Sequence, residues 1–261
     1  MSSTHSPAQP TMSIPKPAPT PAHLHESMMR SVAVLPEGKR LILFTRHSLR
    51  ERSNGGGFAS SDLPLTPKGR VLAKAWGRWL AEHLPYSLDT PSIASPIMRC
   101  VNTAILMQEG ARVSHPVTPQ TLLVEPGSLV TDAERANALF KQIGALNFIN
   151  AFLANSLDCT KSAEHGAGDL LHLLFEHQPK PNQLALAVSH DTLLAAFLGV
   201  MLRDFMSDAR GKRQLDWNDW PKMMEGVFVW FDDADTFADA TAYLIWRGEE
   251  YELPVSMLYS S

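Results

Sequence analysis

The sequence predicts an α/β fold, because short apolar runs alternate with segments of helical periodicity. Residues 41–44 (LILF) form a run of four apolar residues, which is too short for a helix and suits a buried strand. Similar short runs lie at 91–94 and 184–189. Between the first two, Thr66-Pro67 is typical of a helix start, and apolar residues then recur at helical spacing to residue 83.

Polar residues follow each of these strand-like runs. Arg46 and His47 come after the first run, Arg99 follows the second, and His190-Asp191 follows the third. Open α/β sheets bind their ligands at the carboxyl ends of the strands. Guanidinium groups suit phosphate oxygens, and an imidazole can act as a nucleophile near neutral pH. Taken alone, the first cluster is equally compatible with a basic surface turn.

Four motifs, taken together and in order, favour a catalytic site. They are TRHSLR at 45–50, LTPKGR at 65–70, SPIMRCVNTA at 95–104 and VSHD at 188–191. In this order they resemble the histidine phosphatase superfamily, which includes the phosphoglycerate mutases and the histidine acid phosphatases. The resemblance extends over roughly residues 38–250. It implies a three-layer αβα sandwich with a mostly parallel central sheet and a small helical cap insertion at about 108–184.

The resemblance also assigns roles to individual residues. It implies that His47 is the nucleophile and forms a phosphohistidine. The groups expected around the phosphoryl oxygens are Arg46, Arg50, Arg99 and His190. Nearby cations disfavour imidazolium, so they keep the attacking histidine neutral, and we expect a backbone carbonyl to hold its other ring nitrogen. Ser48 departs from the superfamily, in which glycine is usual, and is strained if this position requires a positive φ.

The proton donor for the leaving group is left open between two residues. In the acid phosphatases the aspartate after the second histidine is the acid, which corresponds to Asp191. In the mutase-like branch a glutamate after the middle strand does this work, and Glu125 fits that place. We favour Asp191, because the His-Asp pair is the more explicit match.

The predicted function is hydrolysis of a small phosphorylated substrate through a phosphohistidine. Two alternatives are a phosphoglycerate-mutase-like phosphotransferase and a catalytically silent module that binds a phosphorylated ligand. The mutases carry Glu-Ser and Trp-Asn after their Arg-His-Gly, whereas Leu49 to Arg52 stand here. The phosphatase is therefore preferred over the mutase. The substrate itself is not indicated by the sequence.

Composition restricts the partners. The net charge of −4 and pI near 6.2 argue against a general nucleic-acid binder, and no apolar run approaches the length of a membrane span. Two cysteines, Cys100 and Cys159, form no disulfide framework, which favours a cytoplasmic location. We expect no cofactor and no metal, because the arginines already meet the phosphate charge.

Two further segments were assigned from their patterns. Seven prolines fall at or before Pro36, mixed with Ser, Thr and Ala, which predicts a flexible tail at 1–35 before a domain at 36–261. Residues 55–57, a run of three glycines, suggest a loop over the pocket. The patterns also predict a strand at 121–124, helices within 131–145, 147–157 and 168–178, and a final antiparallel pair of strands at 227–231 and 242–246.

Overall fold

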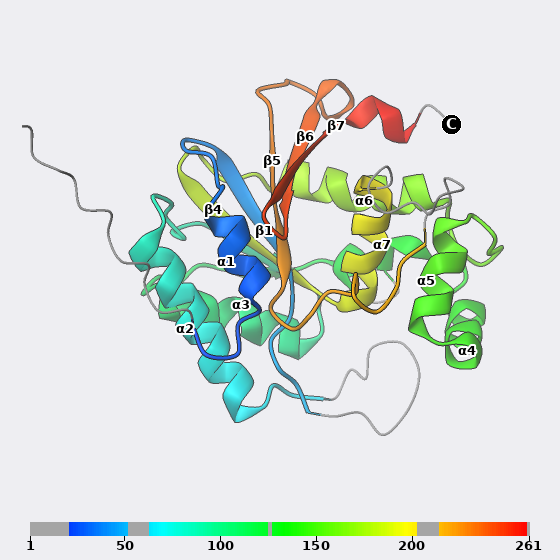
Figure 1. Ribbon diagram of the computed structural model, residues 1–261, viewed down its shortest axis with the longest axis horizontal. Coiled ribbons are helices and arrows are strands. Elements are labelled where there is room, and N and C mark those ends of the chain that lie inside the picture. Colours follow the sequence, from blue (N-terminus) through cyan, green and yellow to red (C-terminus); the bar gives the residue numbers. More distant parts are fainter. Residues whose placement is uncertain (1–20, 52–62, 125–126, 203–213, 260–261) are drawn as a thin grey trace, which may run out of the picture.

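The computed structural model describes residues 21–51, 63–124, 127–202 and 214–259. They form one mixed sheet with helices on both faces (Figure 1). The strands are β1 (Arg40–Arg46), β2 (Ser92–Ala94), β3 (Val117–Pro119), β4 (Gln183–Ser189), β5 (Gly226–Phe231), β6 (Thr241–Trp246) and β7 (Glu249–Pro254). The α-helices are α1 (Glu26–Val32), α2 (Pro67–His83), α3 (Met98–Gly110), α4 (Ala133–Ile143), α5 (Ala145–Leu153), α6 (Ala163–Glu176) and α7 (Asp191–Met201).

The sheet has the strand order β3-β2-β4-β1-β5-β6-β7. The first four strands are parallel to their neighbours, whereas β5, β6 and β7 pair in antiparallel fashion. The α/β class is confirmed, but the prediction of a mostly parallel sheet is wrong for this second half. The short connections from β5 to β6 and from β6 to β7 allow only antiparallel pairing, because a parallel pair needs a long crossover. The antiparallel pairing of β5 with β1 joins this half to the parallel strands.

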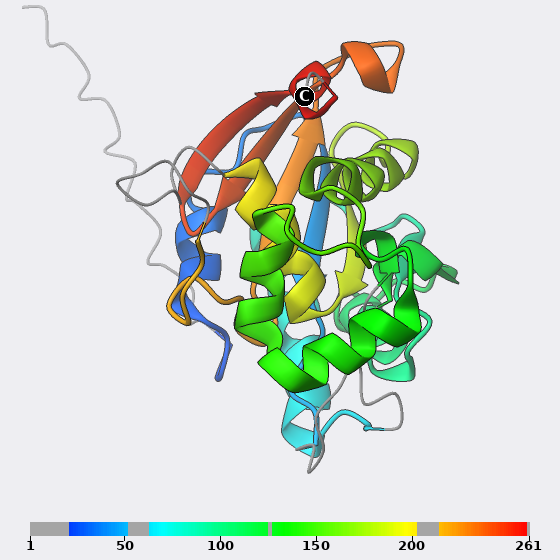
Figure 2. The ribbon, with the colours of Figure 1, turned by 90° about the vertical axis from the view of Figure 1, so that its right-hand side faces the viewer.

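Two apolar cores lie on the two faces of the sheet. Helices α1, α2 and α3 cover one face, where Trp76 is fully buried, and α5, α6 and α7 pack on the other with Phe148 and Phe197 (Figures 1 and 2). Thr66 caps α2 as its sequence predicts, with Oγ1 accepting a hydrogen bond from the Gly69 N–H at 3.0 Å. Within the described ranges, no helix combines the length and apolarity that crossing a bilayer requires.

The stretch predicted as a cap insertion contributes directly to the main fold. Its first residues end α3, residues 117–119 are the edge strand β3, and α5 and α6 supply buried side chains to the same core as α7. The helices predicted here are present with shifted bounds. The strand predicted at 121–124 is wrong. The Gln120 N–H donates to the Ala94 carbonyl. Residues Thr121–Leu123 then form a 3-10 turn that places Leu123 in the core.

The final antiparallel pair is confirmed as β5 and β6, but β7 lies beyond it. Arg247 and Gly248 form the two-residue connection between β6 and β7, with φ values of 54° and 94°. Positive φ at both positions matches the type I′ turn that joins tightly paired strands. The only sequence feature that indicates this turn is the glycine after Arg247. The sequence analysis therefore did not predict the hairpin.

The predicted tail boundary at residue 35 is too late, because α1 packs on the sheet. Met28 is 1% exposed and joins the core with Trp76. A buried carboxylate, Glu225, ties the helix down by accepting hydrogen bonds from Ser27 Oγ at 2.6 Å and Arg247 Nε at 2.9 Å. Residues 26–32 therefore belong to the folded domain.

Truncating the side chain of Met28 should destabilise the protein. We expect Met28→Ala to lower the free energy of unfolding by about 2–4 kcal/mol, as for other buried large-to-small changes. Urea unfolding measures the loss. Met98→Ala, at a site that is 61% exposed, is the control and should change it by less than about 0.5 kcal/mol. Equal effects of the two substitutions would mean that α1 is not docked.

Candidate functional site

The parallel register of β2, β4 and β1 brings three polar residues to one edge of the sheet. Arg46 at the end of β1 is level with Ser189 at the end of β4, and Ala94 of β2 is level with Val188. His47, His190 and Ser95 are each the next residue of their strand. The rings of His47 and His190 lie 5.6 Å apart between centroids. Both histidines are almost fully buried.

His47 has a defined tautomer. Its Nδ1 lies 2.7 Å from the carbonyl oxygen of Ser48, which can only accept, so Nδ1 carries the proton. Nε2 then holds a lone pair, and Arg99 Nε donates to it at 3.0 Å. The backbone of this residue is fixed as well, because the His47 N–H bonds the Ser189 carbonyl at 2.9 Å. Nε2 is therefore the ring nitrogen that carries the lone pair.

Arg99, at the start of α3, joins the two histidines. Its Nη2 lies 3.2 Å from His190 Nδ1 while its Nε contacts His47. Burial lowers the pKa of His47 well below its ordinary value, and the charges of neighbouring groups lower it further. Burial and the Arg99 charge lower the pKa of His190 to about 3. Both imidazoles are consequently neutral at physiological pH.

Arg46 and Asp191 form an ion pair at the edge of this cluster. Arg46 Nη2 lies 2.7 Å from Asp191 Oδ2, and its Nη1 donates to the Pro221 carbonyl at 2.7 Å. The buried Nε of Arg46 has no hydrogen-bond partner among the described residues. Burial raises the pKa of Asp191, but Arg46 and the Trp220 indole N–H, 3.1 Å away, lower it by more. The carboxyl is thus ionised at neutral pH.

One family model matches part of the chain. Residues 42–142 match the family model described as histidine phosphatase superfamily, branch 1. The resemblance to the histidine phosphatase superfamily is confirmed.

Solved structures share the fold of this chain. A structure titled "Mycobacterial hydrolase 2" has a TM-score of 0.55 at 17% identity, over 85% of this chain and 96% of that one. A mycobacterial glucosyl-3-phosphoglycerate phosphatase has a TM-score of 0.54 at 18% identity, over 80% of this chain and 99% of that one. The same enzyme with VO3 has a TM-score of 0.53 at 18% identity, over 80% and 100% of the two chains. No curated protein sequence matches the chain.

Ser48 replaces the usual glycine of the superfamily without strain. It is absent from the described residues with positive φ, and its buried hydroxyl donates to the Gly69 carbonyl at 2.7 Å. Gly69 must itself stay a glycine, because a Cβ there would lie 2.1 Å from the Leu49 oxygen. The Ser48 N–H bonds Thr103 Oγ1 at 3.1 Å. Ser48 therefore connects the loop that carries His47 to the first turn of α2.

Two of the predicted site residues lie apart from this cluster or outside the description. Arg50 donates from Nη1 to the Glu51 carbonyl at 2.9 Å, although its charge still helps to lower the pKa of His190. Glu125 lies outside the described residues, as does the predicted glycine loop at 55–57. The structure brings together the other five, namely His47, Arg46, Arg99, His190 and Asp191.

The sequence analysis did not predict that residues 220–225 hold Arg46, His47 and Asp191 in place. The Trp220 indole N–H bonds Asp191 at 3.1 Å, while Trp217 is 58% exposed. The Arg46 N–H bonds the Glu225 carbonyl at 3.0 Å, and the Met224 N–H contacts the His47 carbonyl at 3.4 Å. Only the two tryptophans marked this segment in the sequence.

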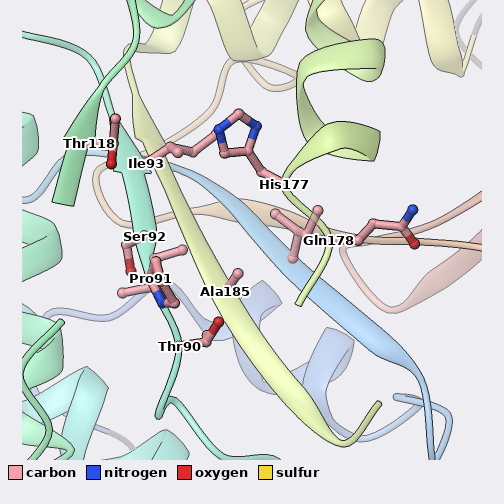
Figure 3. Close-up of a pocket in the computed structure, with 10 residues that line it drawn as sticks. Thr90, Pro91, Ser92, Ile93, Thr118, His177, Gln178 and Ala185 are labelled. Atoms are coloured by element: carbon pink, nitrogen blue, oxygen red, sulfur yellow. The ribbon is translucent and has the colours of Figure 1, made fainter. Parts of the chain in front are cut away.

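A separate pocket of about 200 Å³ lies toward the amino ends of β2 and β4 (Figure 3). His177 reaches across it toward Thr118, and Thr90 and Ser92 lie on the β2 side. None of the five clustered residues lines it. It is therefore distinct from the histidine site at the carboxyl ends of the same strands.

Burial of the two neutral histidines should make the protein acid-sensitive. Each of these histidines has a pKa in the folded protein below its unfolded value near 6.5. As the pH falls below about 6.5, the unfolded state therefore binds protons before the folded state does. The free energy of unfolding decreases as a result. The loss is about 1.4 kcal/mol per pH unit for each histidine. Urea unfolding at pH 7, 6 and 5 measures it, above the range in which the carboxyls titrate.

His190→Gln should reduce the steepness of this loss by about one proton, whereas His172→Gln, whose side chain is 51% exposed, should not. An unchanged slope for His190→Gln would contradict the neutral, buried state of this histidine.

Proposed function

We propose that this protein is a phosphomonoester hydrolase that works through a phosphohistidine at His47 on a small phosphorylated substrate. The observation that carries the proposal is the state of His47, whose Nδ1 proton is held by the Ser48 carbonyl while Nε2 faces Arg99. A neutral imidazole with one fixed proton keeps its lone pair on the other nitrogen, and this lone pair can attack phosphorus once the phosphoryl oxygens take over the Arg99 donor. The mycobacterial phosphatase of similar fold supports a phosphatase without indicating this chain's substrate.

Arg46 and Arg99 would bind the phosphoryl oxygens. Arg99 donates to both histidines in this structure, so these N–H groups already point into the space between the rings. Arg46 offers its unpartnered Nε from the other side. Preorganised donors in a buried site stabilise the charge that develops on the transferring group, because they need no reorganisation.

The reaction then has two steps. His47 Nε2 forms a bond to phosphorus as the bond to the leaving oxygen breaks, and that oxygen takes a proton from Asp191. Water next attacks the phosphohistidine, phosphate is released, and the water proton returns to the carboxylate. Asp191 must first be protonated, although the Arg46 pair favours its ionised form. An arriving phosphate dianion would engage Arg46 and repel the carboxylate, and both effects raise the carboxyl pKa.

The His47 assignment predicts a covalent intermediate. His47→Ala should lower turnover of an aryl phosphate by at least about 10³-fold while the melting temperature changes little. In the wild-type protein, rapid quenching with a ³²P-labelled substrate should trap about one acid-labile phosphoryl group per chain. His172→Ala is the control and should keep full activity.

Near-normal turnover of His47→Ala would contradict the mechanism. Phosphate binding by the wild-type protein without turnover would favour the silent module. Labelled enzyme that passes its phosphoryl group to a second phosphometabolite rather than to water would favour the mutase.

The identity of the proton donor predicts a dependence on the leaving group. A general acid contributes roughly 10²–10⁴-fold, and mainly when the departing oxygen is basic. If Asp191 is the donor, Asp191→Asn should slow alkyl phosphate hydrolysis strongly and nitrophenyl phosphate hydrolysis far less. Glu125→Gln should show no such difference. The reverse pattern would identify Glu125 as the proton donor. Equal losses on both substrates for Asp191→Asn would mean that Asp191 only orients Arg46.

A further inference from the structure

Ser95 is a buried hydroxyl that the proposed chemistry does not yet use. It follows β2 directly, is fully buried, and has its backbone fixed by the bond from its N–H to the Val188 carbonyl at 2.8 Å. Its Oγ lies 2.9 Å from His190 Nε2 and accepts from the Ile97 N–H at 3.3 Å. The side chain is therefore held beside Nε2 of the site's second histidine.

The hydrogen bonds around His190 define its tautomer in this structure. Arg99 has only donors, so His190 Nδ1, 3.2 Å from Nη2, accepts. A neutral imidazole carries one proton, which must then be on Nε2, and Nε2 donates it to Ser95 Oγ. The other polar neighbour of Nε2 is the Cys100 thiol at 3.7 Å, which is a weak hydrogen-bonding group.

A phosphoryl oxygen bound between Arg99 and His190 would reverse the hydrogen-bonding role of His190 Nδ1 from acceptor to donor. The oxygen accepts hydrogen bonds, so His190 Nδ1 must present a proton to it. Without a ligand, burial and Arg99 hold the pKa of His190 near 3, so the ring carries a single proton when the phosphoryl group arrives. A ring that keeps this single proton must then carry it on Nδ1. This form is the neutral tautomer with the proton on Nδ1 and a lone pair on Nε2. The two neutral forms carry the same charge and exchange protons with water.

We propose that Ser95 is a positioning residue that fixes the His190 ring and serves its Nε2 in both tautomers, accepting from it without substrate and donating to it when the phosphoryl group is bound. This inference rests on the proposed function. A hydroxyl is suited to it because it can donate or accept by rotation. The Ile97 N–H can stay on Oγ in both states, since Oγ has two lone pairs.

Substitution of Ser95 tests the role in catalysis. Ser95→Ala should lower kcat/KM for an aryl phosphate by about 10²-fold, the order of loss that misplacement of a catalytic group produces. Ser95→Thr keeps the hydroxyl and should recover most of the loss. Ser92→Ala removes another buried hydroxyl of the same strand, one that accepts from Gln108 instead, and should keep near-normal activity. Melting temperatures of all three variants identify any that are misfolded.

A spectroscopic reading separates this proposal from the proposed function. In ¹⁵N NMR spectra of histidine-labelled protein, the His190 proton should move from Nε2 to Nδ1 when inorganic phosphate is added. Ser95→Ala should lose this defined exchange and show a mixture of tautomers. An unchanged tautomer response in Ser95→Ala, or equal kinetic losses for the alanine and threonine variants, would overturn the role of the hydroxyl. Absence of turnover in the wild-type protein would overturn only the proposed function, because phosphate binding still reports the tautomer.

Discussion

The aligned ends of β2, β4 and β1 are the constraint on which the rest of the site depends. Parallel pairing sets Arg46 level with Ser189, so the residues that follow, His47 and His190, emerge side by side. Arg99 can then contact both rings from the first turn of α3. A shift of one residue in either pairing would turn the side chains to the opposite face of the sheet. The placement of the two histidines thus depends on backbone hydrogen bonds between the strands.

Burial gives this alignment its chemical consequence. Two buried imidazoles enclosed with two guanidinium groups hold a second proton only weakly, so the pKa of both His47 and His190 is lowered. The arginine charge is met on one side by Asp191. On the other side, the Glu225 backbone holds the Arg46 N–H while its side chain binds Ser27 of α1. The amino-terminal helix is therefore connected to the site through one buried residue.

The sequence predicted the parts that local chemistry determines. The strand ending at Arg46, the helix cap at Thr66 and the order of the four motifs were all legible, because apolar runs, capping residues and polar clusters act over a few positions. The antiparallel pairing of β1 with β5 and the docking of α1 were not, since both depend on contacts between residues nearly 200 positions apart, such as Ile42 with Val229 and Ser27 with Glu225. Ser95 and Trp220 were missed as site residues for the same reason: their partners are distant in sequence.

The most direct test of this account is the protonation state of His47. In ¹⁵N-labelled protein without substrate, the imidazole signals should show a proton on Nδ1 and none on Nε2, with no titration between pH 8 and pH 5. Such a spectrum would match the bond from Nδ1 to the Ser48 carbonyl and the lowered pKa of this histidine. A titration near pH 6.5, the ordinary pKa of histidine, or a proton on Nε2, would show that the ring is solvated and would contradict the buried nucleophile.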